Sequence, residues 1–271
     1  MQDFNYNRAK SLAEAASSLK AAADGKFLAG GQTLIPVLKQ RLASPSDLVD
    51  LAGIAGLAGI KATAHTITIG AMTRHADVAA SADVKRLIPA LAELAGGIGD
   101  PHVRNRGMIG GSVANNDPAA DYPAAVLGLG ATVKTDRRSI AADDFFDGLF
   151  TTKLAEGEII TAIEFPVPRR AGYVKFPHPA SRYCLVAVMV AQGPQGDGVQ
   201  GVRVAVTGAG QQGVFRATTL EAALAKAFTV AAIEGVKVPA AGMMSDMHAG
   251  PEYRAHLIGV LARRAVAKAI G

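Results

Sequence analysis

The sequence predicts an α+β fold, and two patterns of elements support this class. Between residues 27 and 51, two short apolar runs flank a helical stretch at residues 34–42, which is the strand–helix–strand order typical of a parallel strand pair. After residue 171 the strands come first and the helices follow. That order is typical of an antiparallel sheet with helices on one face.

The first part of the chain is expected to contain a helix, a parallel strand unit and one further strand. Residues 8–23 carry apolar side chains at helical spacing and are followed by Asp24-Gly25, a stop signal. Thr73 is the expected cap of a short helix at residues 74–80. Strands are expected at residues 27–29, 47–51 and 66–71.

The remaining elements alternate in type along the chain. A long helix is expected to begin at residue 82 and run into Gly96-Gly97. Further strands are expected at residues 131–135, 158–165, 173–176, 184–191 and 201–207, and further helices at residues 122–130, 218–227 and 251–270. The glycine-rich segment 52–60 and the linker-like segment 169–172 place domain boundaries near residues 56 and 171. The predicted units are residues 1–56, 57–171 and 172–271.

Residues 96–123 form a stretch rich in glycine, proline and unpaired polar groups. Its run Gly107-Met108-Ile109-Gly110-Gly111-Ser112 contains three glycines, at which the backbone can approach a ligand closely. Successive N–H groups in such a loop can form a nest for an anion, and a diphosphate is the favoured candidate. Asp121, shortly downstream, suits a sugar hydroxyl better than a phosphate. A ligand-free surface loop has the same composition and stays the alternative for this stretch alone.

A second glycine turn lies in Leu28-Ala29-Gly30-Gly31-Gln32-Thr33-Leu34-Ile35, between an apolar strand and the start of a helix. Free N–H groups at such a position can bind an anion. The turn lacks the Lys-Ser/Thr pair of a P-loop and the spacing of a GxGxxG fingerprint, so neither a Walker nucleotidase nor a Rossmann dehydrogenase is supported. The presence of two such loops favours a ligand over ordinary turns.

Together, the two loops and their surroundings resemble the FAD-binding medium subunit of the molybdenum hydroxylases, a group that includes carbon monoxide, nicotine and aldehyde dehydrogenases and the flavin domain of xanthine dehydrogenase. The similar segments cover nearly the whole chain: Phe4-Asn5-Tyr6, AGGQT, Leu48-Val49-Asp50-Leu51, residues 67–70, VRNRGMIGGS with DPAADYP, and Phe215-Arg216-Ala217-Thr218. The resemblance implies a two-subdomain FAD-binding fold of the PCMH type, followed by a C-terminal α+β domain.

The resemblance also implies which residues contact FAD. The two loops that embrace the diphosphate in the family correspond to Ala29, Gly30, Gly31, Gln32, Thr33, Leu34 and Ile35, and to Met108, Ile109, Gly110, Gly111 and Ser112. Asp121 matches an acidic contact, Ile160 a residue against the flavin, and Lys175 a residue near its polar edge. FAD is expected to bind non-covalently, and no catalytic residue is assigned to this chain.

Three segments depart from the family pattern. Met108 stands where Thr is common, and Asn115-Asn116 stands where Ala-His-Ala-like residues are common. Pro177-His178-Pro179 follows the lysine where basic residues are common. The first departure should matter little to a backbone nest, whereas the third leaves the local conformation at Lys175 open.

The implied function is electron transfer within an oxidoreductase complex. FAD would take electrons from iron–sulfur clusters in a small partner subunit, and the molybdenum cofactor would belong to a large partner subunit. Cys184 is the only cysteine, and a cluster normally needs four thiolates, so any cluster must lie in another chain. Cys184 itself lies in an apolar run and is expected to be buried. No His or Cys residues occur at the spacing typical of a metal site, and no metal site is predicted.

Composition and sequence motifs argue against membrane, secreted and nucleic-acid-binding proteins. No apolar run approaches the roughly 20 residues of a membrane helix, and no secretory signal is visible, so a cytoplasmic location is expected. The net charge is +5, but the basic residues are scattered, so nucleic-acid binding is not expected. His102, beside the second loop, is either an acid–base group or a loop cap. Two other functions stay open: a self-contained FAD oxidase or reductase of related fold, and a non-catalytic nucleotide-binding or scaffold protein.

Overall fold

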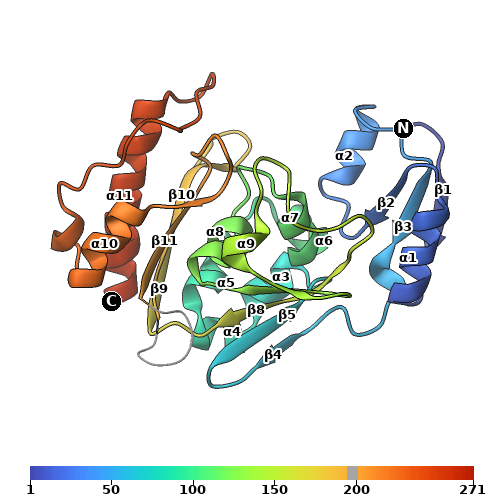
Figure 1. Cartoon of the computed structure of the whole chain (residues 1–271), viewed down its shortest axis with the longest axis horizontal. Coiled ribbons are helices and arrows are strands. Elements are labelled where there is room, and N and C mark those ends of the chain that lie inside the picture. Colours follow the sequence, from blue (N-terminus) through green and yellow to red (C-terminus); the bar gives the residue numbers. More distant parts are fainter. Residues whose placement is uncertain (194–200) are drawn as a thin grey trace.

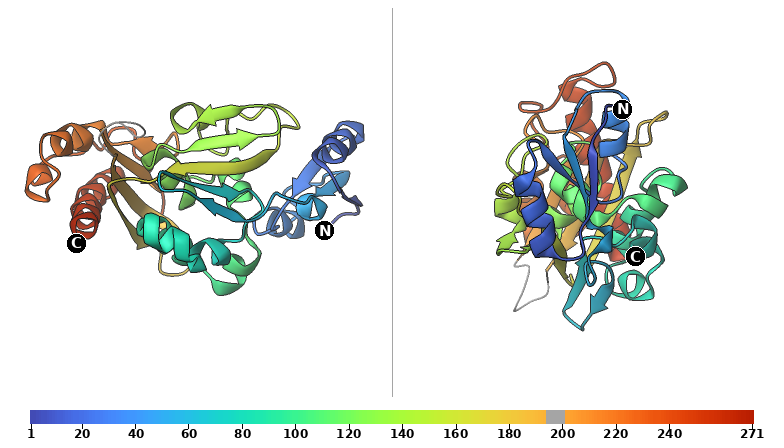
Figure 2. Two further views of the ribbon diagram at one scale, coloured as in Figure 1. Left: turned by 90° about the horizontal axis from the view of Figure 1, so that it is seen from below. Right: turned by 90° about the vertical axis from the view of Figure 1, so that its right-hand side faces the viewer.

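The computed structural model describes residues 1–193 and 201–271, and within them the chain forms three β-sheets that follow one another along the molecule (Figure 1). The N-terminal sheet lies at one end, a five-stranded sheet with several helices lies in the middle, and a four-stranded sheet with the C-terminal helices lies at the other end (Figures 1 and 2). This mixture of helices and sheets confirms the predicted α+β class.

The N-terminal unit is a parallel sheet in the order β1-β3-β2. Its parallel pairing of β2 with β3 confirms the strand–helix–strand unit expected at residues 27–51. The first helix begins at Ser11, whose side chain accepts a hydrogen bond from the N–H of Glu14, as an N-cap does. The elements are β1 (Asn5–Arg8), α1 (Leu12–Ala21), β2 (Gly25–Leu28), α2 (Leu34–Lys39), β3 (Asp47–Asp50) and the 3₁₀ helix η1 (Leu51–Gly53).

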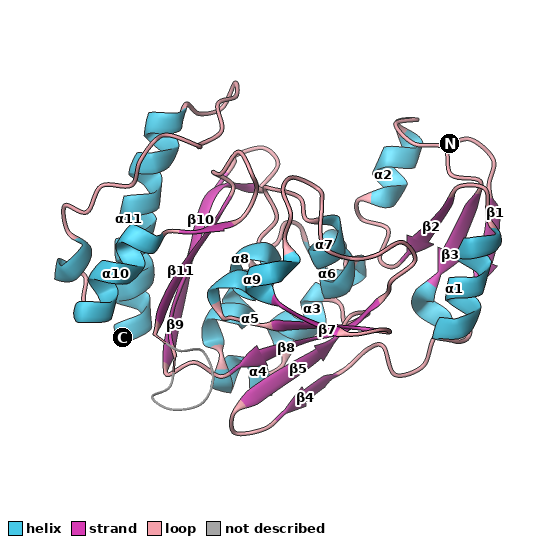
Figure 3. Ribbon diagram, viewed as in Figure 1, coloured by secondary structure: helices cyan, strands magenta, loops and turns pink. Residues whose placement is uncertain are grey.

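The middle unit is an antiparallel sheet in the order β4-β5-β8-β6-β7, with helices over one face (Figures 1 and 3). Every residue of helix α8 (Tyr122–Gly128) is buried, because this helix packs against two strands of the C-terminal sheet, β10 (Cys184–Gln192) and β11 (Val202–Thr207). It also packs against three helices of its own unit, α5, α7 and α9, whose bounds follow. The strands are β4 (Ile60–Ala62), β5 (Thr66–Gly70), β6 (Thr132–Thr135), β7 (Ser139–Ala141) and β8 (Ile160–Pro166). The helices are α3 (His75–Ala80), α4 (Ala82–Leu87), α5 (Pro89–Gly96), α6 (Pro101–Arg106), α7 (Ile109–Asn115), α8 (Tyr122–Gly128) and α9 (Ala142–Phe145).

Three local predictions in this unit are wrong. The single helix expected from residue 82 is two helices, because Pro89 begins α5 and disfavours a helical conformation at Ile88 before it. Thr73 does not cap α3; its hydroxyl bonds to the backbone of Gly59, and Arg74 occupies the cap position. The segment 108–112, expected as part of a loop, opens helix α7.

The C-terminal unit is an antiparallel sheet in the order β12-β11-β10-β9, with helices on one face (Figure 3). The opposite face packs on the middle unit, since Ala187, Met189 and Ala205 belong to the same core cluster as the residues of α8. The elements are β9 (Arg170–Pro177), β10 (Cys184–Gln192), β11 (Val202–Thr207), β12 (Phe215–Arg216), α10 (Thr218–Lys226), the 3₁₀ helix η2 (Ala231–Ile233) and α11 (Pro251–Ile270). The division into three domains stays a prediction.

None of the helices in residues 1–193 and 201–271 has the length and apolar character needed to cross a membrane. The cytoplasmic location stays a prediction. Cys184 is buried, as expected from its apolar neighbours.

Arg254 connects the last helix to the sheet. Its side chain is 2% exposed, and Nη1 donates to the carbonyl oxygens of Leu185 at 2.7 Å and Gly208 at 2.5 Å. Nη2 donates to Asp246 Oδ2 at 2.6 Å. These bonds satisfy buried acceptors at the start of β10 and just beyond the end of β11, so one guanidinium group links α11 to the sheet in addition to their apolar packing.

We expect Arg254→Met to lower the free energy of unfolding by roughly 2–4 kcal/mol, because two buried carbonyl groups and one carboxylate lose their donor. Chemical denaturation measures the change. Arg264→Met, which removes an exposed arginine from the same helix, is the matched control and should change stability by less than about 0.5 kcal/mol. Equal stabilities for the two variants would contradict the role assigned to Arg254.

Candidate functional site

A cavity of about 540 Å³ lies where the N-terminal unit, the middle unit and the region of β9 meet. Most of its wall is apolar, with contributions from Phe27, Leu34 and Ile98. Most of the residues predicted to contact FAD line it: Ala29, Gly30, Gly31, Gln32, Thr33, Leu34, Met108, Gly110, Gly111, Ser112, Asp121, Ile160 and Lys175. Residues far apart in the sequence are therefore brought to one cavity. Their contacts with a cofactor stay predictions.

Two residues of the predicted set do not line the cavity. Ile109 is fully buried in the hydrophobic core of the middle unit. Ile35 lies beside Gly31, where an added Cβ would be 2.8 Å from Ile35 Cγ1. Ile109 therefore supports the second loop from within the core, and Ile35, which is half-buried, packs against Gly31 of the first loop.

The glycines of the two loops have different structural roles. A Cβ at Gly30 would lie 2.1 Å from the carbonyl oxygen of Arg106, and a Cβ at Gly110 would lie 2.5 Å from Ala71 Cβ. These two glycines are required by contacts within the protein. Gly111 is different, since its Cβ would meet only Ala29 Cβ, at an ordinary 3.7 Å. The space beside Gly111 belongs to the cavity.

Backbone donors in the cavity come mainly from the first loop. Within the described residues, no hydrogen bond uses the N–H groups of Gly31, Gln32, Thr33 and Leu34. In the second loop the N–H groups of Gly107, Ile109 and Gly110 are bonded to the carbonyls of Val103, Thr73 and Ala71, whereas that of Gly111 has no partner in the described chain. The N–H of Met108 also has no partner in the described residues. The predicted nest of successive free donors is thus wrong for the second loop, because its two unpaired donors, Met108 and Gly111, are separated by bonded ones.

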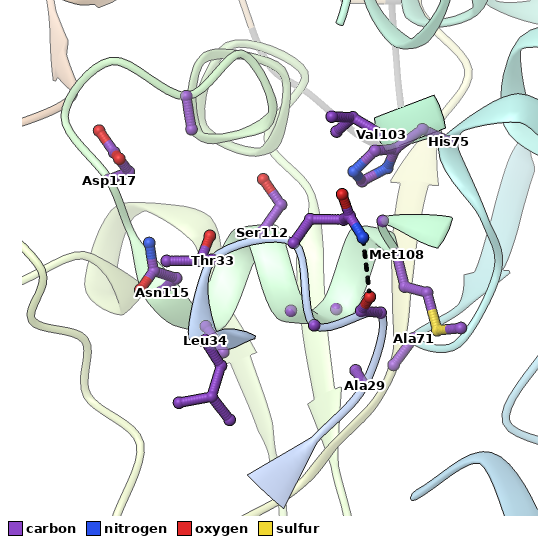
Figure 4. Close-up of a pocket in the computed structure, with 18 of the residues that line it drawn as sticks. Ala29, Thr33, Leu34, Ala71, His75, Val103, Met108, Ser112, Asn115 and Asp117 are labelled. Carbon is purple, nitrogen blue, oxygen red and sulfur yellow. Dashed lines mark hydrogen bonds between the residues drawn. The ribbon is translucent and has the colours of Figure 1, made fainter. Parts of the chain in front are cut away.

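Figure 4 shows His75 and Val103 at one end of the cavity and Asn115 and Asp117 at the other, with Ser112 between them. Of these lining residues, only Ser112 was predicted from the sequence as a cofactor contact. Asp117 could have been found from its place in the DPAADYP segment that follows the second loop. No sequence pattern pointed to His75 as a lining residue. His102, by contrast, has a side chain that is 97% exposed and does not line the cavity.

Charged side chains of both signs line the cavity, three basic and three acidic: Lys26, Lys175 and Arg182, and Asp117, Asp121 and Glu158. The carboxylate of Glu158, also in the wall, is neutralised by two hydrogen bonds of 2.9 Å from Arg138, and these bonds lower its pKa to about 2. Burial lowers the pKa of His75 to about 4, so its imidazole is neutral at pH 7.

Asp121 is buried and has two donors of its own. The hydroxyl of Tyr173 donates to Oδ1 at 2.5 Å, and Nζ of Lys175 donates to Oδ2 at 3.0 Å. Lys175 lies in the regular part of β9, opposite Ala187 on β10. The Pro177-His178-Pro179 segment therefore leaves the strand conformation at Lys175 intact.

Comparison with known proteins identifies the family. Residues 2–168 match the family described as the FAD binding domain in molybdopterin dehydrogenase. The chain belongs to this family. The flavoprotein chain is 37% identical over 283 residues to the carbon monoxide dehydrogenase medium chain of Afipia carboxidovorans, with 98% of this chain and 96% of the relative covered. It is 37% identical over 225 residues to the glyceraldehyde dehydrogenase medium chain of Sulfolobus acidocaldarius, with 81% and 80% covered.

A solved structure shows the same fold. The flavoprotein chain superimposes on a chain of the Cu,Mo-CO dehydrogenase in its cyanide-inactivated form with a TM-score of 0.84 and 35% sequence identity, covering 98% of this chain and 97% of that chain. The predicted resemblance is therefore confirmed, and so are the fold class and the assignment to the oxidoreductases.

The cavity itself fits FAD. Free backbone donors of the first loop and of Gly111 suit a diphosphate, and the open space beside Gly111 is a cradle that a side chain would fill. A buried carboxylate suits sugar hydroxyls, and the apolar wall suits a flat ring system. Within the described residues, no group of three or more His, Cys, Asp or Glu side chains is placed to hold a metal ion.

We expect Gly111→Val to fold normally but to bind almost no flavin. The added Cβ meets no crowded protein atom, and the side chain extends into the space next to the free N–H. Absorbance of the purified protein measures flavin content, and thermal denaturation checks the fold. The control is Gly259→Val in α11, where a Cβ would meet only the end of the Arg263 side chain, at 3.8 Å. Full flavin content in the Gly111 variant would refute the assignment of this turn.

We expect Asp121→Ala to weaken FAD binding by roughly ten- to a hundred-fold, because a charge-assisted hydrogen bond to a ligand hydroxyl contributes about 1.5–3 kcal/mol. Titration of flavin-stripped protein with FAD gives the dissociation constant. An unchanged affinity would leave Asp121 as a structural residue that only pairs with its neighbours on β9.

Proposed function

We propose that this flavoprotein chain relays electrons within a multi-subunit molybdenum hydroxylase, from iron–sulfur clusters of a small partner subunit through FAD to an external acceptor. The observation that carries the proposal is the cavity, which has donors for a diphosphate and a buried carboxylate beside it. When bound, FAD supplies the capacity to accept electrons singly or in pairs. The residues of this chain bind and orient it.

The single cysteine of the chain and the names of its relatives support the assignment of the clusters and the substrate site to other subunits. Cys184 is the only cysteine in the sequence and lies buried beside Tyr173, so it cannot assemble a cluster. Relatives of equal similarity are named for complexes that act on carbon monoxide and on glyceraldehyde. Since these substrates differ so widely, we infer that the substrate is selected by a large molybdenum-bearing subunit and not by this chain.

The runner-up function is a self-contained FAD oxidase or reductase. It would require a substrate site on this chain in addition to the flavin site. An experiment on the complex and on the chain alone separates the two functions.

We expect a complex purified by a tag on this chain to reduce a dye with candidate substrates such as carbon monoxide, aldehydes or N-heterocycles, whereas the isolated chain supplied with FAD should not. In a complex that carries Gly111→Val, substrate should still reduce the iron–sulfur clusters, as seen by electron paramagnetic resonance, but dye reduction should fall at least ten-fold. Turnover by the isolated chain at the rate of the complex would refute the relay and establish the oxidase.

A further inference from the structure

A cluster of buried polar side chains lies behind the cavity wall, and the proposed function does not account for all of it. We call Asp121, Tyr173, Lys175 and Cys184 the β9 cluster. Asp121 and Lys175 line the cavity, whereas Tyr173 and Cys184 do not. The Tyr173 hydroxyl lies 2.5 Å from Asp121 Oδ1 and 3.6 Å from the Cys184 sulfur. Tyr173, which does not line the cavity, is thus hydrogen-bonded to Asp121, which does.

Strand β9 places two hydrogen-bond donors beside the carboxylate of Asp121. Tyr173 and Lys175 are two positions apart in a regular strand, so their side chains point to the same face. Tyr173 donates to one oxygen of Asp121 and Lys175 to the other, at 3.0 Å. Rotation of the carboxylate would break at least one of these bonds. Each oxygen keeps a second lone pair, which is available to a ligand in the cavity.

The hydroxyl of Tyr173 keeps its proton and so remains a hydrogen-bond donor to Asp121. Burial, together with the negative charge of Asp121, raises the pKa of Tyr173 well above its ordinary value. Burial also raises the pKa of the Cys184 thiol. Both groups stay protonated across the physiological pH range, so the hydroxyl always has a proton to donate to Asp121.

The backbone around Asp121 is already fixed by other contacts. The hydroxyl of Thr207 donates to the carbonyls of Pro118 and Ala120, at 3.0 and 2.8 Å. The N–H groups of Gly208 and Cys184 donate to Pro118 and Ala119. With the main chain held in this way, the remaining conformational freedom of Asp121 is rotation of its side chain. Tyr173 and Lys175 restrict it.

We propose that Tyr173 is a positioning residue that orients the carboxylate of Asp121 toward a sugar or ribityl hydroxyl of FAD. The inference rests on the proposed function, because it requires FAD in the cavity. Tyr173 acts only through Asp121 and does not touch the ligand. Lys175 faces the cavity and has a second acceptor, the carbonyl oxygen of Gly97 at 3.3 Å, so Tyr173 is the member of the pair whose hydrogen bonds lie wholly within the β9 cluster.

We expect Tyr173→Phe to raise the dissociation constant of FAD by roughly three- to thirty-fold in the purified, flavin-stripped complex, because Asp121 loses one donor and its fixed orientation. The ring is retained, so the fold should be unaffected. Tyr122→Phe is the matched control: this tyrosine is also fully buried, is adjacent to Asp121 in sequence, and has a hydroxyl without a partner in the described chain. The control should bind FAD as the wild type does.

A double-mutant cycle shows whether Tyr173 acts through Asp121. In an Asp121→Ala background, Tyr173→Phe should have no further effect on FAD affinity, since the group it orients is absent. A separate variant with 4-aminophenylalanine at position 173 keeps a donor at the same place and should restore most of the wild-type affinity. This rescue variant also decides the matter if Tyr173→Phe fails to fold.

Three results would overturn the inference: an unchanged affinity in Tyr173→Phe, an equal loss in Tyr122→Phe, or an equal loss from Tyr173→Phe with and without Asp121. Failure of the proposed function is a separate outcome, because it would appear as absence of FAD binding by the wild-type complex. If the wild type binds FAD and the cycle is additive, only the role of Tyr173 is refuted.

Discussion

The site depends on direct packing of backbone against backbone between the N-terminal and middle units. Gly30 lies so close to the carbonyl oxygen of Arg106 that no side chain fits there. Within the middle unit, Gly110 is likewise too close to Ala71 to carry a side chain. The Gly30 contact places the turn after β2 against the junction between α6 and α7, and the Gly110 contact holds the start of α7 against Ala71. Because the N–H groups of residues 31–34 have no partner within the described chain, they remain available to a ligand in the cavity between the units. The glycines thus create the site mainly by allowing this approach.

The C-terminal sheet completes the same site from the other side. Strand β10 begins at Cys184 and strand β11 ends at Thr207, and both residues bond to the backbone of residues 118–120. Strand β9 adds Tyr173 and Lys175, which hold Asp121. Arg254 in turn bonds to the carbonyl groups of Leu185, the second residue of β10, and of Gly208, just beyond the end of β11. The sheet therefore serves as a support for the acidic segment of the cavity, and its packing is linked to the orientation of a single carboxylate.

Features encoded locally could be predicted from the sequence. The parallel strand unit, the two glycine turns and the burial of Cys184 each follow from residues close together in the chain, and the family resemblance added Asp121, Ile160 and Lys175. Hydrogen-bond occupancy could not be predicted in this way. Whether the N–H of Gly110 is free depends on Ala71, which lies in a different segment. The bond between Asp121 and Tyr173 joins residues 52 positions apart and depends on how β9 lies against the middle unit.

Flavin analysis of the wild-type complex tests the central claim, that the cavity is a non-covalent FAD site, most directly. The complex would be purified by a tag on this chain, denatured and separated by chromatography, with the released flavin identified by mass and quantified against the chain. The account predicts one FAD per chain, all of it released by denaturation. Absence of flavin, a flavin without the adenosine diphosphate part, or flavin that stays with the polypeptide would contradict it.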